Sequence, residues 1–160
     1  MGHRASIYAS THPVTRSDLK RHLVASTRVV TAYIEAIQCR ELPGDRVDLV
    51  DLWRRMWGID HVPIDMVAVM QRPLFTVDQV AEMVNVTSHT IRRAGNGFDR
   101  KWNLPEHVDL GERVRRYLPL HIHSWINRSA PEPWLVRRRG PLGPMGLTLK
   151  NAKPELQRGA

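Results

Sequence analysis

The side chains best suited to chemistry with a partner lie together between residues 88 and 93. They combine two hydroxyl groups, an imidazole and two guanidinium groups, and they are Ser88, His89, Thr90, Arg92 and Arg93. Such groups form hydrogen bonds with base edges and contact phosphates when they project from the start of a helix. The pattern therefore points to recognition of a nucleic acid, which requires no catalytic residue.

The surrounding sequence, FTVDQVAEMVNVTSHTIRRAG, predicts two helices joined by a short turn. Thr76, with a glutamine three residues later, has the spacing of a capping box at the start of the first helix. Asn85 follows where a tight turn needs a left-handed residue, a conformation that asparagine tolerates. Either Thr87 or Ser88 can cap the second helix, whose apolar Ile91 is expected to face the first helix. The polar and cationic side chains then lie on the outer face.

The segment after these helices has a characteristic order. Leu104-Pro105 precedes VDLGERVRRYL, which predicts a two-stranded hairpin, and LPLHIHSWI, which predicts a short helix ending in Trp125-Ile126. Residues 75–126 as a whole resemble the winged helix-turn-helix of phage excisionases, AlpA-type regulators and the N-terminal domain of MerR regulators. The resemblance covers about a third of the 160 residues. The link AGNGFDRKWN is longer than in that family.

The resemblance implies roles for individual residues. Residues 88–93 would read the major groove, and three wing arginines would reach the sugar-phosphate backbone or the flanking minor groove. The three are Arg113, Arg115 and Arg116. In an extended strand Arg113 and Arg115 share one face, with Val114 on the other. The alternative is a solvated edge strand whose charges prevent aggregation.

An earlier stretch of the chain repeats the helix-turn-helix pattern. A shift of 61 positions places Ser26 on Thr87 and aligns Val47-Asp48-Leu49 with Val108-Asp109-Leu110. Residues 15–58 are therefore predicted to form a divergent first module. Its second helix would present Thr27, Arg28 and Thr31 to DNA.

The first module differs from the second after its Leu42-Pro43 step. Residues 48–57 have apolar side chains at helical spacing, which predicts a helix at this place. Its buried stripe would consist of Leu49, Leu52, Trp53, Met56 and Trp57. The first module is therefore expected to lack a full wing. The alternative interpretation is that residues 18–38 and 48–58 are packing helices with a chance resemblance.

Together these patterns predict a mainly α fold with a small β-hairpin wing. Two tandem winged helix-turn-helix modules would be followed by a basic, extended C-terminal tail. The predicted segments are an N-terminal arm (1–14), a first module (15–58), a connector (59–74), a second module (75–127) and the tail (128–160). Pro63 and the apolar residues after it predict a short packed connector, which would hold the two modules in a fixed relation.

Positive charge is concentrated in the tail. The chain has a formal net charge of +8, and residues 128–160 contribute seven Lys or Arg against two Glu. Such a balance favours polyanionic partners and salt-sensitive association. One interpretation is a basic arm along phosphates or in a minor groove, formed by Arg137, Arg138 and Arg139; the other is a solubilising tail. Trp134 and Leu135 predict a docking site for this segment.

Residues typical of enzymes and metal sites are scarce. Cys39 is the only cysteine, which excludes a disulfide within the chain and a cysteine-based zinc site. His121 and His123 are two apart on a predicted helix, so they face different directions. We expect no catalytic residue, no metal and no cofactor. Without a signal peptide or an apolar run of about 20 residues, the chain is expected in the cytoplasm of a prokaryote, with no membrane partner.

The sequence therefore predicts a sequence-specific double-stranded DNA-binding protein. Its expected role is that of a small transcriptional regulator or an excisionase-like accessory factor of a phage or mobile element. RNA polymerase, a recombinase and a second copy of the chain are further candidate partners. One alternative is the small subunit of a viral terminase, which needs a long assembly helix. Another is an adaptor whose first module binds a protein through exposed Trp53 and Trp57.

Overall fold

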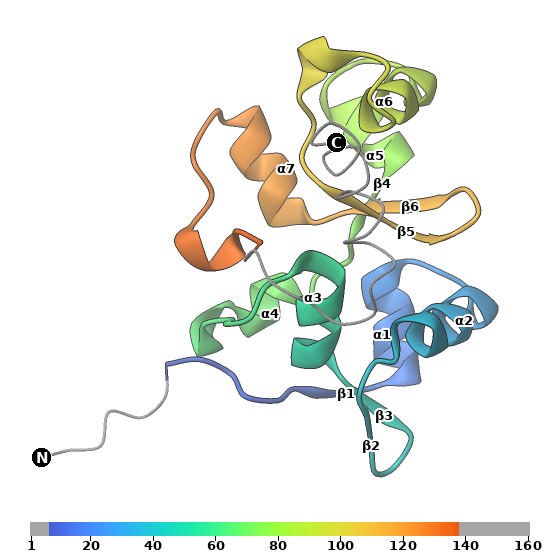
Figure 1. The fold of residues 1–160 in the computed structure, drawn as a ribbon, viewed down its shortest axis with the longest axis vertical. Helices are drawn as coiled ribbons and strands as arrows, with labels where there is room; N and C mark the ends of the chain where they lie inside the picture. Colours follow the sequence, from blue (N-terminus) through green and yellow to red (C-terminus); the bar gives the residue numbers. More distant parts are fainter. Residues whose placement is uncertain (1–6, 138–160) are drawn as a thin grey trace, which may run out of the picture.

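Residues 7–137 are described by the computed structural model, with the exception of the Arg100 side chain. Over these residues the chain forms seven α-helices and two three-stranded antiparallel sheets (Figure 1). The fold is therefore mixed α/β, which corrects the prediction of a mainly α fold with a single hairpin wing. No helix in this range has the length and apolar character needed to cross a membrane.

The first half of the structure is built around two helices and a short hairpin. Its elements are β1 (Pro13–Thr15), α1 (Arg16–Leu23), α2 (Thr27–Ile37), β2 (Glu41–Leu42), β3 (Arg46–Asp48) and α3 (Leu49–Trp57). Thr15 begins α1 with a capping box, Ser26 caps α2, and Val24 makes the turn between them at φ 52°. α3 buries the predicted apolar stripe, both tryptophans included.

The second half repeats this order of elements. They are β4 (Phe75–Thr76), α5 (Val77–Met83), α6 (Ser88–Gly95), a 3₁₀ turn η2 (Arg100–Trp102), β5 (His107–Gly111), β6 (Val114–Tyr117) and α7 (Pro119–Ile126). The predicted capping box joins Thr76 and Gln79, Thr87 caps α6, and Asn85 adopts φ 56° in the turn. The local predictions for this helix pair are confirmed.

The two sheets have the same strand order. They are β1-β3-β2 and β4-β6-β5, and Val14 faces Val47 as Phe75 faces Tyr117. β3 therefore occupies the place of β6, and the predicted alignment of residues 47–49 with residues 108–110 is wrong. The reason is that nine more residues separate the helix pair from the central strand in the second half. The sequence predicts that the first half lacks a full wing. At this place the structure has the short hairpin β2–β3.

The two halves share one hydrophobic core. The alternation of side chains along β5 sends Val108 and Leu110 toward the first half, where they join the cluster that contains the α3 stripe. A second, smaller cluster lies between α5, α6 and α7 around Val80, Ile91 and Ile122. β5 also contacts α2, so the hairpin of the second half rests on the first half (Figure 1).

The connector between the halves is packed, as predicted. It contains a 3₁₀ turn η1 (Ile64–Met66) and α4 (Val67–Met70). Met70 is buried, and the N–H of Ala9 donates to the carbonyl of Val62 at 2.9 Å. Residues 7–12 of the predicted N-terminal arm therefore belong to the fold.

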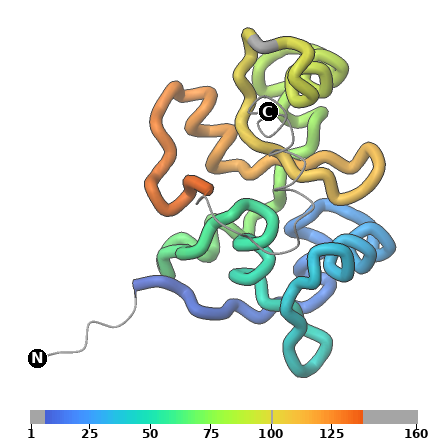
Figure 2. Tube along the Cα trace, viewed as in Figure 1, coloured from blue at the N-terminus to red at the C-terminus, as the bar shows by residue number. Residues whose placement is uncertain are grey.

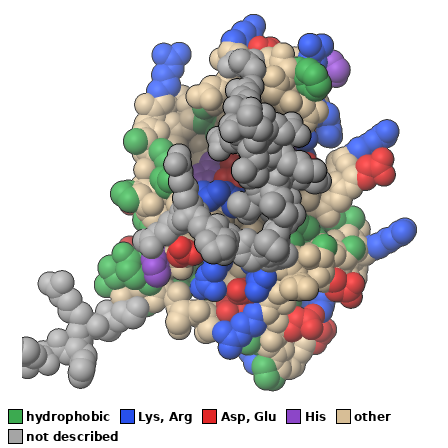
Figure 3. Space-filling model, viewed as in Figure 1, with side chains coloured by type: hydrophobic (Ala, Val, Ile, Leu, Met, Phe, Trp, Pro, Cys, Tyr) green, Lys and Arg blue, Asp and Glu red, His purple; other side chains and the backbone are tan. Residues whose placement is uncertain are grey.

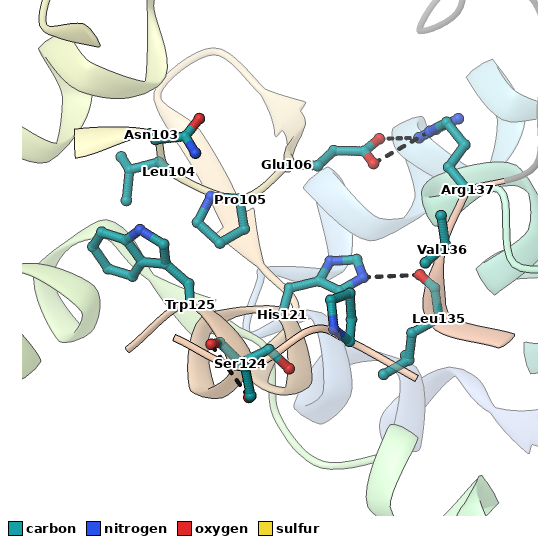
Figure 4. A pocket seen from close by; sticks show the side chains of 12 residues that line it. Asn103, Leu104, Pro105, Glu106, His121, Ser124, Trp125, Leu135, Val136 and Arg137 are labelled. Atoms are coloured by element: carbon teal, nitrogen blue, oxygen red, sulfur yellow. Dashed lines mark hydrogen bonds and ion pairs between the residues drawn. The ribbon is translucent and has the colours of Figure 1, made fainter. Parts of the chain in front are cut away.

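After α7 the chain turns back and lies against both halves (Figure 2). Residues 128–137, which we call the strap, include a 3₁₀ turn η3 (Pro133–Leu135), and Leu135 is buried in the shared core. His121 of α7 donates its Nε2–H to the Leu135 carbonyl at 3.1 Å, beside a cavity of about 340 Å³ (Figure 4). The predicted docking of Trp134 and Leu135 is confirmed, and the prediction of an extended tail is wrong for the strap.

Candidate nucleic-acid interface

α6 presents the polar side chains that the sequence predicts to contact DNA. The Thr87 hydroxyl fixes its first turn by accepting the Thr90 N–H at 3.2 Å. Ile91 is fully buried and packs in the same cluster as Val80 of α5. One side of α6 is thus anchored, and the helix lies at one end of the molecule (Figure 1). His89 and Arg93 on it are exposed.

Three of these side chains are free to bind a partner. His89 and Arg93 are exposed and Arg92 is half-buried, and within the described residues none of the three makes a side-chain hydrogen bond or ion pair. Ser88 and Thr90 are already engaged. The Ser88 hydroxyl donates to Asp78 Oδ1 at 2.5 Å, and the Thr90 hydroxyl lies 3.0 Å from that of Thr87.

Arg115 does not project from the hairpin as predicted. Its Nε donates to Asp109 Oδ1 at 3.0 Å, its Nη2 to Asn96 Oδ1 at 2.7 Å and its Nη1 to the Arg92 carbonyl at 3.4 Å. Hydrogen bonds from His107 and then from Arg115 lower the pKa of Asp109 to about 2, so this carboxylate is ionised at neutral pH. Arg115 therefore clamps the hairpin to the C-terminal end of α6, where helix carbonyls favour a cation.

Gly95 allows this close approach between α6 and the hairpin. A Cβ atom at this position would lie 2.8 Å from Arg115 Nη1 and 3.1 Å from Tyr117 Oη. α6 ends at Gly95, and Gly97 follows with φ 83°.

We expect Arg115→Ala to lower the free energy of unfolding by about 1–2 kcal/mol. The substitution removes charge-assisted hydrogen bonds from a half-buried clamp, leaves Asp109 with His107 as its remaining donor and leaves Asn96 Oδ1 without the guanidinium. Urea denaturation followed by tryptophan fluorescence measures the change. Arg113→Ala is the matched control, because Arg113 is exposed on the same hairpin. Equal stability of the two variants would show that the clamp contributes nothing.

Arg116 also has a structural role, which corrects its prediction as a DNA contact. Its Nε donates to the Leu23 carbonyl at 2.9 Å and its Nη2 to the Val24 carbonyl at 2.5 Å. Burial lowers the pKa of the Arg116 guanidinium. Because neighbouring residues of a strand point to opposite sides, Arg115 reaches α6 while Arg116 reaches the C-terminal end of α1. Arg116 thereby ties the two halves together.

Arg113 is the one predicted wing arginine that remains at the surface without a partner among residues 7–137. It lies in the hairpin turn with φ 61°, and not in β6, so it does not share a strand face with Arg115. Lys and Arg side chains project from the end of the molecule formed by α5 and α6 and from the hairpin tip, where an acidic side chain stands beside them (Figure 3).

The predicted contacts of the first half lie on α2. Thr27 and Arg28 are exposed and Thr31 is half-buried. Arg28 is the only cation of this helix, and Glu35 is exposed on it as well, so the charges of α2 sum to zero. α2 therefore offers a phosphate much less attraction than α6, which carries two arginines and no carboxylate.

Arg137 is held by the protein and does not begin a free basic arm. Its Nη2 donates to the Met56 carbonyl at the end of α3 at 3.1 Å, and its guanidinium forms an ion pair with Glu106 (Figure 4). This corrects its prediction as a DNA contact. Arg138 and Arg139, predicted for the same arm, lie outside the described residues.

Arg137→Ala is expected to lower the free energy of unfolding by about 1–2 kcal/mol, because the strap loses its charged link to Glu106 and α3. Thermal and urea unfolding measure the loss. Arg128→Ala removes an exposed strap arginine that has no partner within the described chain and should change stability by less than about 0.5 kcal/mol. A larger effect at Arg128 than at Arg137 would contradict the assignment.

Gly95, Asn96 and Asp109 are the site residues that the sequence analysis missed. Asp109 faces Arg115 in the β5–β6 register only because an irregularity between Asp109 and Gly111 shifts the pairing by one residue. A regular hairpin with its turn at Glu112 and Arg113 would place Asp109 opposite Arg116, so the sequence pattern does not predict this pair. The approach of Gly95 and Asn96 has no sequence signal either, because it depends on the path of the chain after α6.

No family model, curated protein or solved structure matches this chain at a significant level. The resemblance to winged helix-turn-helix proteins therefore rests on the motif itself. Among the side chains that the structure describes, no group of three or more His, Cys, Asp or Glu could hold a metal ion. The geometry of α6 and of the hairpin is the basis for functional inference.

Proposed function

We propose that this protein binds double-stranded DNA in a sequence-specific manner and reads the major groove with α6. One observation carries the proposal. His89 in the first turn of α6 and Arg92 and Arg93 in its last turn make no side-chain hydrogen bond or ion pair within residues 7–137, and the helix is held by a hydrophobic cluster and by Arg115. Preorganised donors on a fixed helix suit base edges and phosphates.

The hairpin tip would contribute a second, sequence-independent contact. Arg113 stands at the tip, whereas Arg115 and Arg116 hold the hairpin in place. A single cation at a wing tip fits a sugar-phosphate backbone or a minor-groove edge. A single DNA-recognition helix agrees best with the role of a transcriptional regulator or an excisionase-like accessory factor of a phage or mobile element.

We further propose that the two halves are copies of one winged helix-turn-helix unit, of which the second reads DNA. The shared strand order and the left-handed residues Val24 and Asn85, which are 61 positions apart like the caps Ser26 and Thr87, support the duplication. The neutral surface of α2 supports a lesser role for the first copy. The first copy packs against the hairpin of the second copy, because α2 contacts β5.

The adaptor hypothesis in its original form is contradicted by the structure. Trp53 and Trp57 have no exposed surface, and the indole N–H of Trp53 is directed to His22 Nε2 at 3.1 Å. These side chains belong to the core, and they cannot form a surface for a partner protein.

Selection from a random duplex library with the full-length protein tests the proposal. About 150 mM salt suppresses binding through phosphates alone. We expect one enriched motif of the length covered by a single recognition helix, and no enrichment of it by the Arg92→Ala/Arg93→Ala variant. Two half-sites would assign reading to α2 as well. No enriched sequence with the wild-type protein would overturn sequence-specific binding.

A further inference from the structure

An open groove lies at the end of the second half where α5, η2 and α7 meet. It has a volume of about 600 Å³. Its apolar lining consists of Val84, Trp102, Trp125 and Ile126, and the charged side chains that line it among those the structure describes are Lys101 and Arg128. We call this surface the tryptophan groove.

The floor of the tryptophan groove is rigid. The indole N–H of Trp125 donates to the Trp102 carbonyl at 3.1 Å, and the two ring centroids are 6.4 Å apart. Both rings are half-buried, and Ile126 beside them is 39% exposed. Large aromatic side chains that are already fixed lose little conformational entropy on binding, which is why tryptophan dominates the centres of protein interfaces.

The rim of the groove has a single sign of charge. Lys101 Nζ lies 5.9 Å from the centre of the Trp102 ring, and the exposed Arg128 follows α7 in the left-handed conformation at φ 52°. Within the described residues neither cation has a carboxylate partner. A ligand that covers the apolar floor and supplies carboxylates at both ends would satisfy the whole surface.

Two other occupants fit this surface less well. Residues 138–160 contain five Lys or Arg and one Glu, so like charges would oppose their binding between Lys101 and Arg128. A DNA backbone supplies negative charge but leaves Val84 and Ile126 without apolar contacts. The C-terminal end of α7 and the β5–β6 tip also point to opposite sides of the molecule (Figure 1).

From this complementarity we propose that the tryptophan groove binds an acidic segment of a partner protein. The segment carries bulky aliphatic or aromatic residues that cover Trp102, Trp125 and Ile126, flanked by Asp or Glu that pair with Lys101 and Arg128. The proposed DNA contacts His89, Arg92, Arg93 and Arg113 do not line this groove. The protein can therefore hold DNA and a protein partner at the same time, and the groove does not depend on the DNA-binding proposal.

The groove is tested by selecting, from a displayed library of random peptides about 12 residues long, those that bind the full-length protein. The expected peptides combine carboxylates with Leu, Phe or Trp. A synthetic, labelled copy of the most enriched peptide is then titrated by fluorescence anisotropy against the wild type and the Lys101→Glu/Arg128→Glu variant. We expect the charge reversal to weaken binding about tenfold or more.

The Arg21→Glu/Arg72→Glu variant makes the same change of charge at two exposed arginines that are not candidate DNA contacts and should bind the peptide like the wild type. Circular dichroism and thermal unfolding check that both variants are folded. Neutral or basic selected peptides, or equal binding by the groove variant, would overturn the proposal. So would loss of duplex DNA binding by the groove variant alone, which would assign the groove to DNA. Sedimentation that shows self-association abolished by the groove variant would assign it to a second copy.

Discussion

Replacement of Arg92 and Arg93 by alanine is expected to weaken binding to the selected duplex by on the order of 1–3 kcal/mol per residue. Neither guanidinium group makes a hydrogen bond or ion pair among residues 7–137, so their removal breaks no such bond in the free protein. The loss should therefore fall on the complex. Fluorescence anisotropy with the selected duplex and a scrambled duplex at several salt concentrations measures both affinity and sequence preference.

Arg21→Ala provides the matched control for this experiment. Arg21 lies on α1, its side chain is 75% exposed, and its ion pair with Asp18 is on the surface, so the substitution removes the same charge without touching α6. Arg113→Ala should lower affinity for both duplexes alike and reduce the salt dependence by about one phosphate contact. If the double α6 variant distinguishes the two duplexes as well as the wild type does, α6 is not the reading helix.

Acidification from about pH 6.5 to about pH 4 is expected to destabilise the fold by about 3 kcal/mol through His22. This side chain is 1% exposed and links α1 to α3 and to the connector. Its Nδ1–H donates to the carbonyls of Gln71 and Arg72 at 3.1 and 2.9 Å, and its Nε2 accepts the indole N–H of Trp53 at 3.1 Å. Only the neutral ring can make this set of hydrogen bonds, because a protonated Nε2 would face another donor.

The direction of the pH effect follows from the pKa shift. Burial lowers the pKa of His22 from 6.5 to about 4, so between these values the unfolded chain binds a proton that the folded chain does not. Stability is therefore complete above about pH 6.5 and falls as the pH decreases toward 4. Burial also lowers the pKa of His121, which adds to the effect with the same sign.

His22→Gln separates this contribution from the rest. The amide can still donate to a carbonyl, but it does not titrate, so the variant should be less stable at about pH 7 and lose less stability on acidification than the wild type. Urea denaturation at about pH 7 and about pH 4.5 gives both free energies. His89→Gln, at an exposed position on α6, should keep the full dependence. An unchanged dependence in His22→Gln would assign the titration to another group.

The local structure of the helix pairs follows from residues that are close together in the chain. Thr76, Asn85 and Thr87 adopt the cap, turn and cap conformations that their side chains favour, and the apolar stripe of α3 is buried as its spacing predicts. These features depend on hydrogen bonds and side-chain positions within a few residues. The sequence does not show which strands of the two halves correspond. Val47-Asp48-Leu49 has residue types like those of residues 108–110 in β5, but β3 pairs with β1 as β6 pairs with β4.

Long-range contacts determine which of the predicted DNA-binding arginines are available to a partner. Arg116 is bound by the Leu23 carbonyl, 93 positions away, and Arg137 by the Met56 carbonyl, 81 positions away. A guanidinium group has the same donors in either setting, and its partner depends on which carbonyls and carboxylates the packed chain brings within about 3 Å. The sequence thus shows that the chain has cations to offer, and the packing of its two halves decides that Arg92, Arg93 and Arg113 remain free while Arg115, Arg116 and Arg137 hold the fold together.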